Sequence, residues 1–313
     1  MTEERRKILP FVSLAILYVV WGSTYMAIRI VVHDMPPMAA AALRFLLAGV
    51  IMAGVAAVAD RKHGRPTRRQ LADYAFAGVL LLAVGNGLVM WSEKRIASSI
   101  AALIVASTPV WLTLFDGFRA GGQKWTVRVW TGTLIGLMGV VLVARPEGGI
   151  DPGHWSSILA LQCATLAWTS GTLYAQSVQR RLPLFTAASV EMLAGGAVLV
   201  ALSFFMGEEI SRFATAGRDA WWALAYLTVF GSLVAFTAFA YCVNELPAST
   251  VGTYAYVNPV VAVILGAAFL DERLTSGLIA GGALILVAVL FATMGKRTAP
   301  PPAAAAVPAA DRA

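Results

Sequence analysis

The chain has 313 residues, of which 58% are hydrophobic and only 13% are charged, and its mean hydropathy is +0.73. Soluble proteins carry roughly 25% charged residues, so this composition excludes an ordinary soluble protein. The formal net charge of +7 indicates no nucleic-acid partner, because basic loops that face anionic lipid head groups account for it.

Apolar runs follow one another along nearly the whole chain. A run of about 20 residues is long enough to cross a hydrocarbon core of about 30 Å. We predict ten transmembrane helices, at residues 9–31, 38–58, 72–91, 97–117, 127–145, 155–176, 184–206, 220–243, 248–270 and 276–295. Transmembrane β-strands would instead alternate in segments of about ten residues, so the expected fold class is all-α integral membrane.

The two halves of the chain match each other at a nearly constant offset. The matched pairs include Trp21 with Trp168, Pro36 with Pro183, Arg44 with Glu191, Gly49 with Gly196 and Pro109 with Pro259. Each half would hold five spans, and because this number is odd, the second half would cross the membrane in the opposite sense. The sequence therefore predicts two inverted-topology five-helix repeats, the architecture of many secondary transporters.

The repeats and the loop charges predict how the chain is organised across the membrane. We expect a cytoplasmic N-terminus at residues 1–8, a first repeat at residues 9–145 and a second repeat at residues 155–295. The Pro/Ala-rich residues 296–313 are expected to form a disordered tail. Most of the 24 Lys and Arg residues fall on the side of the two termini, so the positive-inside rule puts both termini in the cytoplasm.

Two charged residues lie inside predicted spans, at matched positions and with opposite signs. Glu191 lies about 12 Å beyond Pro183, at about 1.5 Å per helical residue. A charge within a span costs about 2.5–3.5 kcal/mol on insertion scales and is therefore a functional-site hypothesis. Glu191 either binds a proton or a substrate amine, or it is a structural partner of another span. Arg44 either lines a central cavity or extends to the interface. One hypothesis covers both residues: they face the cavity and either pair or hold the two ends of a zwitterion.

Aromatic and hydroxyl side chains complete the candidate substrate site. Trp21, Thr24 and Tyr25 share one face of the first span, and Trp168 and Thr172 are their counterparts in the sixth. Aromatic rings within a span either stack on an organic substrate or cation, or serve as packing residues.

Further candidates lie near the ends and bends of other spans. Tyr254 and Asn258 belong to a polar stripe in the ninth span, and Asn86 is expected to line the outer mouth. Pro109 and Pro259 are the predicted hinges, because each proline removes a helical hydrogen bond. Glu93 either lines the same mouth or, because two basic residues follow it, lies in a solvated loop, and the loop is the favoured expectation.

The sequence lacks the motifs that are typical of nucleotide-binding, zinc and catalytic sites. It contains no G-x-x-x-x-G-K-[ST] phosphate loop and no H-E-x-x-H zinc helix. The three histidines lie in loops or at span ends, and cysteines and histidines are too few for a metal site. We therefore expect no enzyme, no catalytic residues, no cofactor and no metal.

The chain resembles the EamA-type drug/metabolite transporter superfamily, and within it the YedA-like bacterial inner-membrane members. The resemblance rests on Trp21-Gly22-Ser23-Thr24-Tyr25, Leu43-Arg44-Phe45-Leu46-Leu47-Ala48 and Asn258-Pro259-Val260. It implies ten helices in two inverted EamA repeats, a bacterial cytoplasmic (inner) membrane location and export of metabolites or toxic organic molecules. One departure is that residues 119–123 of the first half lack the acidic pair that the second half has at Asp271-Glu272.

The predicted function is a secondary transporter that exports amino acids or related small metabolites by alternating access. The expected partners are a small organic solute, membrane lipids and, as a candidate coupling ion, the proton. One alternative is efflux of lipophilic cations or drugs, with Glu191 and the aromatic residues as the cation site. Another is a membrane interaction protein that moves nothing. Gly132 and Gly136 have a spacing typical of helix contacts, which leaves a homodimer open.

Overall fold

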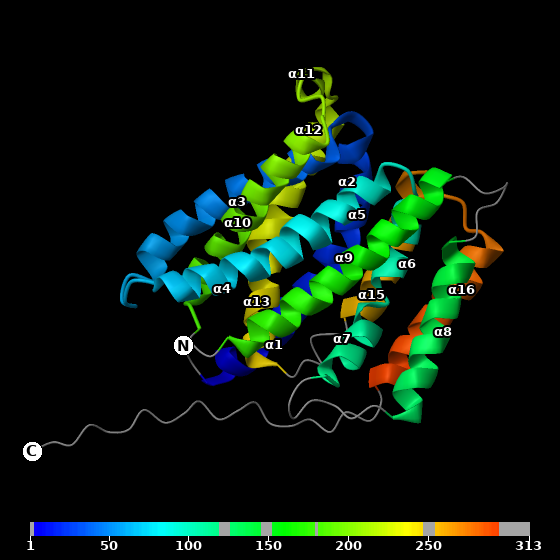
Figure 1. Cartoon of the computed structure of the whole chain (residues 1–313), viewed down its shortest axis with the longest axis horizontal. Helices are drawn as coiled ribbons and strands as arrows, with labels where there is room; N and C mark the ends of the chain where they lie inside the picture. Colours follow the sequence, from blue (N-terminus) through cyan, green and yellow to red (C-terminus); the bar gives the residue numbers. More distant parts are fainter. Residues whose placement is uncertain (1–2, 119–125, 145–151, 179–180, 247–253, 294–313) are drawn as a thin grey trace, which may run out of the picture.

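The computed structural model describes residues 3–118, 126–144, 152–178, 181–246 and 254–293, and within them every regular element is a helix. The first half contains α1 (Glu3–Ile16), η1 (Leu17–Trp21), α2 (Gly22–Asp34), α3 (Pro37–Ala59), α4 (Arg68–Gly78), η2 (Val79–Asn86), α5 (Gly87–Glu93), α6 (Ser98–Val105), α7 (Thr108–Asp116) and α8 (Val127–Ala144). The second half contains α9 (Pro152–Ser177), α10 (Leu184–Phe205), α11 (Arg212–Thr215), α12 (Arg218–Tyr226), η3 (Leu227–Val234), α13 (Ala235–Glu245), α15 (Tyr254–Phe269) and α16 (Ser276–Thr293). Figure 1 shows these helices as a bundle.

Six helical stretches are long and apolar enough to cross a membrane, judged by length and composition. They are Ile8–Asp34, Pro37–Ala59, Arg68–Glu93, Ser98–Asp116, Leu184–Phe205 and Arg218–Cys242. Shorter apolar helices are Trp130–Val143, Val257–Phe269 and Ser276–Ala288. Helix α9 has 26 residues but is not among them, because residues such as Gln162, Thr165 and Thr169 make it more polar. The prediction of an all-helical membrane fold is thus confirmed. The predicted tail at residues 296–313 lies outside the described residues.

Helices α3 and α10, which are the second helices of the two matched halves, pack against each other (Figure 1). The contact is reciprocal. A Cβ atom on Gly49 would lie 3.1 Å from the Leu193 nitrogen, and one on Gly196 would lie 3.1 Å from the Leu46 nitrogen. Gly49 matches Gly196 in the duplication, and Leu46 matches Leu193. Matched residues therefore exchange roles across this contact.

The ends of α3 and α10 are capped in the same reciprocal manner. The Asp60 carboxylate follows α3 and accepts hydrogen bonds from the backbone N–H of Thr186 (2.9 Å) and its hydroxyl (2.8 Å), at the start of α10. Glu208 follows α10, and its carboxylate accepts from the backbone N–H groups of Met38 (3.0 Å) and Ala39 (2.8 Å) at the start of α3. The free N–H groups at each helix start are satisfied by an acid that follows the other helix.

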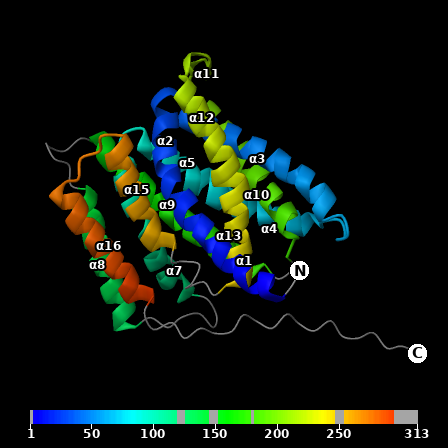
Figure 2. The ribbon, with the colours of Figure 1, turned by 180° about the vertical axis from the view of Figure 1, so that it is seen from behind.

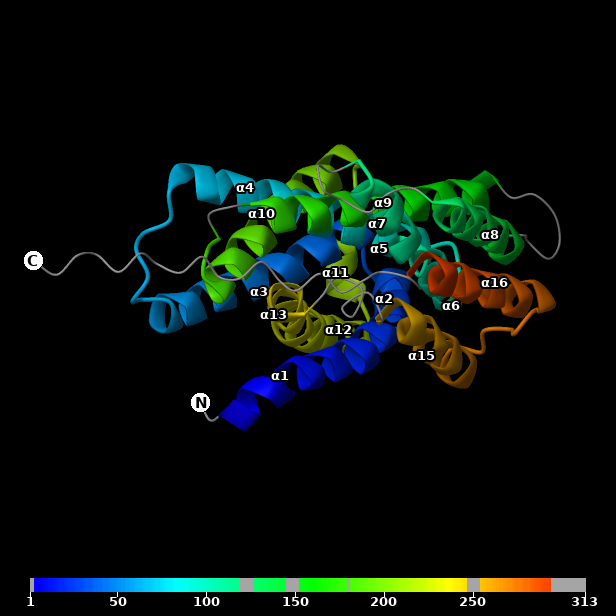
Figure 3. The same cartoon turned by 90° about the horizontal axis from the view of Figure 1, so that it is seen from below.

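Helices α8 and α16, the last of each half, form a second close pair at one side of the bundle (Figures 1 and 3). A Cβ atom on Gly139 would lie 2.8 Å from the Gly281 carbonyl oxygen, so these backbones touch. The predicted helix contact at Gly136 falls inside the chain, since its nearest neighbour is Ala288. Seen from behind in Figure 2, α1 lies beside α13.

A glycine also sets the closest approach of α4 to α10. A Cβ atom on Gly78 would overlap the Glu191 carbonyl oxygen. Overpacking of this kind costs about 1–3 kcal/mol, so Gly78→Ala is expected to lower the free energy of unfolding by that amount. Unfolding in mixed micelles measures the change. The control is Gly54→Ala, since no atom lies within 4 Å of a Cβ atom at Gly54. Equal stability of the two variants would contradict this close contact.

Candidate functional site

Three spans change locally from α-helical to π-helical winding in the middle of the bundle, at η1, η2 and η3. Segments η2 and η3 occupy equivalent positions in the two halves, which agrees with the duplication. A π-helical turn widens the helix and shifts its carbonyl groups and side chains, and such turns occur frequently at functional sites. These segments supply several of the groups described below.

Arg44 projects from α3 into the centre of the bundle and is held there by neutral groups. Its Nε donates to the Ser232 hydroxyl on η3 at 2.8 Å, and its Nη1 donates to the Asn86 side-chain oxygen at the end of η2 at 3.2 Å. The side chain is 3% exposed, and its guanidinium carbon lies 4.7 Å from the centre of the Phe45 ring. Within the described residues no carboxylate forms an ion pair with it. A buried guanidinium with neutral partners keeps its charge available for an anion.

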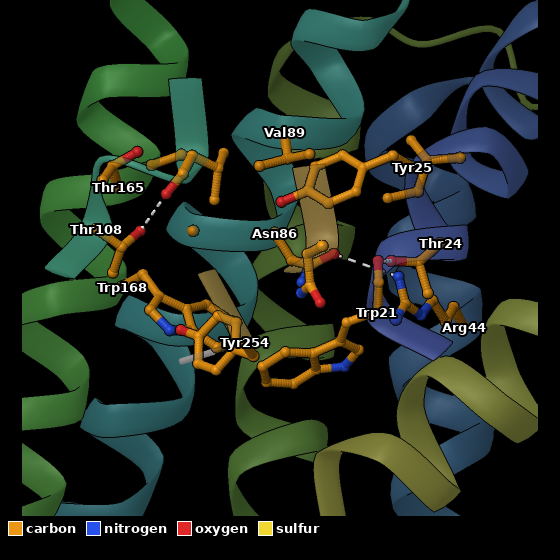
Figure 4. Close-up of a pocket in the computed structure, with 15 residues that line it drawn as sticks. Trp21, Thr24, Tyr25, Arg44, Asn86, Val89, Thr108, Thr165, Trp168 and Tyr254 are labelled. Carbon is orange, nitrogen blue, oxygen red and sulfur yellow. Dashed lines mark hydrogen bonds between the residues drawn. The ribbon is translucent and has the colours of Figure 1, made fainter. Parts of the chain in front are cut away.

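Arg44 lines a cavity that most of the predicted site residues share. We call it the central cavity; it is lined by Trp21, Thr24, Tyr25, Ile28, Arg44, Gly85, Asn86, Val89, Val105, Thr108, Ala164, Thr165, Trp168, Tyr254 and Asn258. In Figure 4, Tyr25 and Val89 lie on one side of it, with Trp21, Trp168 and Tyr254 opposite. The volume is 80 Å³, below the roughly 300 Å³ at which small-molecule sites begin, so a solute needs it to widen.

Four aromatic side chains form a cluster that borders the central cavity. The Trp21 ring centre lies 5.6 Å from Trp168, 5.0 Å from Phe239 and 5.2 Å from Tyr254. Trp168 and Phe239 are 5.7 Å apart, and the Trp21 ring nitrogen donates to the Gly231 carbonyl oxygen at 3.4 Å. Phe239 also lines a second cavity. This aromatic cluster therefore lies between the two cavities.

The second cavity contains Glu191, and we call it the Glu191 cavity. It is lined by Tyr74, Leu81, Thr172, Ala175, Gln176, Arg181, Leu182, Leu184, Ala187, Glu191, Phe236, Phe239 and Ala240, and its volume is 60 Å³. The Glu191 side chain is 5% exposed. No hydrogen bond or ion pair of its carboxylate is found within the part of the chain that the structure describes. A buried carboxylate in aromatic surroundings favours a cationic or protonated group.

Two wider openings lie beyond these cavities, at opposite ends of the bundle. One, which we call the Arg65 cleft, has a volume of 470 Å³ and is lined by His63, Gly64, Arg65, Pro66, Gln70, Arg181, Leu182 and Pro183. It shares Arg181 and Leu182 with the Glu191 cavity. At the other end, the Arg29 vestibule has a volume of 440 Å³ and is lined by Arg29, Ile30, His33, Asp34, Ala97, Asp219, Ala220, Leu270 and Glu272. The cleft, the Glu191 cavity, the aromatic cluster and the central cavity are thus joined by shared residues, and the vestibule begins at Arg29, the residue after Ile28 of the central cavity.

The structure divides the predicted substrate-site residues between two cavities. Arg44, Trp21, Thr24, Tyr25, Asn86, Trp168, Tyr254 and Asn258 meet at the central cavity, whereas Glu191 and Thr172 line the Glu191 cavity. Arg44 and Glu191 do not pair and do not share a cavity. A single zwitterion held by both at once therefore finds no support in this conformation.

The two predicted hinge prolines have different surroundings. Pro109 stands at the start of α7, directly after the break at Ala106 and Ser107 that divides the fourth span. Pro259 lies inside the continuous helix α15. Asn258 precedes it, and in the amide orientation that satisfies its neighbours its nitrogen donates to the carbonyl oxygens of Tyr18 and Tyr254, each at 3.1 Å. Asn258 therefore joins α15 to the π-helical segment η1.

Sequence reasoning missed several groups of the site. Ser232 holds Arg44, and Thr108 and Thr165 add hydroxyls to the central cavity. The repeated Gly-polar pairs Gly85-Asn86 and Gly231-Ser232 were a signal for Ser232. The favoured expectation for Glu93, a solvated loop, was wrong, because its side chain is 0% exposed. The prediction assumed that Glu93 shares the exposure of Lys94 and Arg95. These two residues are exposed, whereas Glu93 faces the bundle.

Apolar helices that enclose a cavity with a buried, neutrally held arginine define a polytopic membrane protein with an internal polar cavity. The chain belongs to the EamA-like transporter family, whose model matches residues 9–145 and 155–294. The family membership predicted from the sequence is thus confirmed.

Individual relatives agree with this family. The chain is 37% identical over 294 residues to the Escherichia coli (strain K12) protein named uncharacterized inner membrane transporter YedA, and the match covers 93% of each chain. It is 23% identical over 275 residues to the Bacillus subtilis (strain 168) protein named uncharacterized transporter YoaV, covering 88% of this chain and 93% of that one. One crystal structure has a TM-score of 0.66 at 20% identity, covering 91% of this chain and 98% of its own, and this likeness shows the fold alone.

Proposed function

We propose that this protein is a secondary transporter that moves a small organic solute bearing a carboxylate through the centre of the bundle. The observation that carries this proposal is Arg44, a buried guanidinium that lines the central cavity with only neutral hydrogen-bond partners in the described residues. A carboxylate supplies the missing charge and accepts two parallel N–H hydrogen bonds. Trp21, Tyr25 and Trp168 then enclose the organic part of the solute.

Alternating access between two inverted repeats, residues 9–145 and 155–295, is the proposed mechanism. The reciprocal contacts of α3 with α10 support it, because matched residues exchange roles there, as two inverted five-helix units would require. In this scheme the two halves exchange conformations, and the central cavity opens to one end of the bundle at a time. Pro109 and Pro259 serve as hinges. Both termini lie in the cytoplasm, so the Arg65 cleft faces the cytoplasm.

Amino acids and related metabolites are the leading solute class. Glu191 supports this class, because its buried carboxylate suits an amine that passes through the Glu191 cavity on the way to Arg44. In this scheme the amine of the solute binds Glu191 first, and its carboxylate then binds Arg44. We further propose that the direction is export, and that Glu191 releases the amine when it takes up a proton.

The second candidate function is efflux of lipophilic cations. Glu191 favours it as well, since Phe236, Phe239 and Tyr74 line the same cavity and aromatic faces attract organic cations. Such solutes carry no carboxylate and would leave Arg44 without a role.

A panel of solutes distinguishes the two candidates. The purified protein is reconstituted into vesicles with a pH gradient, and radiolabelled amino acids, carboxylates without an amine, and quaternary ammonium compounds are offered in turn. We expect flux of carboxylate-bearing solutes, with dissipation of the pH gradient if transport is proton-coupled. Flux of quaternary ammonium compounds alone would favour the second candidate, and flux of none of them in active vesicles would contradict the leading proposal.

A further inference from the structure

Glu93 is the most unusual charged residue outside the two cavities. It is the last residue of α5, its side chain has no exposed surface, and neither carboxylate oxygen has a hydrogen-bond partner in the described part of the chain. An ionised carboxylate without partners in such a place has a large free-energy cost. The carboxyl group therefore carries a proton in this conformation.

The surroundings of Glu93 hold the groups that would respond to a change in its charge. Arg29 on α2 donates to the main-chain carbonyl oxygen of Glu93 and also interacts electrostatically with its carboxyl group. Tyr25 on α2 and Glu272, in the segment after α15, interact with it electrostatically. Helix α2 also carries His33 and Asp34 at its end. Of the other helices packed against α5, η2 and α6 contain no titratable residue, α3 contributes Arg44, and α9 contains His154, Cys163 and Tyr174.

Glu272 forms a latch at the same end of the bundle. Its carboxylate accepts hydrogen bonds from the Ser98 backbone N–H and hydroxyl, both at 2.7 Å, and from the Ser99 backbone N–H at 3.0 Å. These contacts fasten the start of α6 to the end of α15. Asp271 turns the chain there with a φ of 52°, a conformation that aspartate tolerates better than most residues. The Glu272 latch borders the Arg29 vestibule, and only residues 94–97 separate Glu93 from Ser98.

We infer that Glu93 is a proton-binding site that controls the Glu272 latch. With a proton on Glu93, the Glu272 carboxylate has no negative neighbour there, and the latch holds α6 closed. When Glu93 loses its proton, the two carboxylates repel each other and Arg29 moves from the carbonyl oxygen to the carboxylate. The latch then weakens, and the central cavity opens toward the vestibule. The link to transport rests on the proposed function, whereas proton binding and opening do not.

The inference is tested without any transported solute, by the labelling of a cysteine below the latch. Val89→Cys reports on the central cavity, because Val89 lines it one turn before Glu93 and is buried. The background carries Cys163→Ala and Cys242→Ala, which removes the two native thiols. A membrane-impermeant maleimide is added to intact cells, or to inside-out vesicles if the control reacts only there. The control is Ser211→Cys, an exposed position at the vestibule end, and it corrects for the reactivity of the thiol itself.

We expect the corrected labelling of Val89→Cys to rise about 10-fold from acidic to mildly alkaline pH. Adding Glu93→Gln should remove this pH dependence and keep labelling at its low value. Adding Glu272→Ala should keep labelling high at every pH. An unchanged pH dependence in Glu93→Gln would overturn the inference.

A second measurement remains decisive even if Glu93→Gln does not fold. The infrared band of a protonated buried carboxyl group is recorded in Glu191→Gln, which leaves Glu93 as the fully buried carboxyl group of the described residues. We expect the band to persist at neutral pH and to disappear as the corrected Val89→Cys labelling rises. A spectrum without this band at neutral pH would overturn the inference while leaving solute binding at Arg44 untouched.

Discussion

Replacing Arg44 with glutamine is expected to lower the transport of carboxylate-bearing solutes about 100-fold while the protein remains folded. The loss of one partner from a buried charge pair costs about 2–5 kcal/mol, and about 2.7 kcal/mol corresponds to that factor. The glutamine amide nitrogen can take the place of the Arg44 Nε and donate to the Ser232 hydroxyl, so one of the two local hydrogen bonds is retained. The measurement is initial flux in reconstituted vesicles over a range of solute concentrations.

Two controls make the Arg44 result specific. Arg218→Gln removes a charge from an exposed position and is expected to leave flux unchanged. Quaternary ammonium compounds, which have no carboxylate, should be unaffected in Arg44→Gln if they are carried at all. Wild-type carboxylate flux in Arg44→Gln would show that the charge of Arg44 is structural and would remove the main support for the proposed function.

Glu191→Gln is expected to have an effect of similar size on a different set of solutes. Glutamine matches the shape of glutamate but has no charge, so solutes with an amine should lose about 100-fold in transport by the same energetic argument. Carboxylates without an amine should cross at the wild-type rate, because they depend on Arg44 and not on Glu191. Competition between an amino acid and its deaminated analogue, measured in one vesicle preparation, gives the comparison directly.

The matched variant for this prediction is Glu209→Gln, an exposed glutamate near the vestibule end. It should behave as wild type toward every solute. If Glu191→Gln lowers the transport of both solute classes equally, Glu191 acts on the conformational change or on packing and does not recognise the amine. If it lowers neither, Glu191 is a partner of the surrounding helices only.

The all-helical membrane fold and many of the residues that line the central cavity could be predicted from the sequence. Apolar runs set the helices, because hydropathy along a run is a local property. Trp21, Tyr25, Trp168 and Tyr254 could be grouped because each repeats or extends a pattern within its own span, and all four reach the central cavity. The duplication also showed that Arg44 and Glu191 occupy equivalent positions in the two halves, although their charges are opposite.

The separate places of Arg44 and Glu191 could not be predicted in this way. Their matched positions suggest a shared cavity, but the ring of Phe239, from a span far along the chain, helps to close the aromatic cluster between them. Ser232 was missed for a related reason. Its hydroxyl accepts a hydrogen bond from Arg44 and belongs to the π-helical segment η3. The apolar pattern of that span does not indicate a change from α-helical to π-helical winding.

Sequence alone thus determined the class of the protein, its all-helical fold, its internal duplication and many of the residues that line its central cavity, because these depend on composition and on periodicity along a helix. The tertiary structure decided which charges meet and which are isolated. Glu93 shows the difference: beside Lys94 and Arg95 in the chain it has the pattern of a solvated residue, yet the packing of α5 leaves it buried and without a hydrogen-bond partner among the described residues. The free energy of a charge depends on what surrounds it in space, and neighbours in sequence are only a small part of those surroundings.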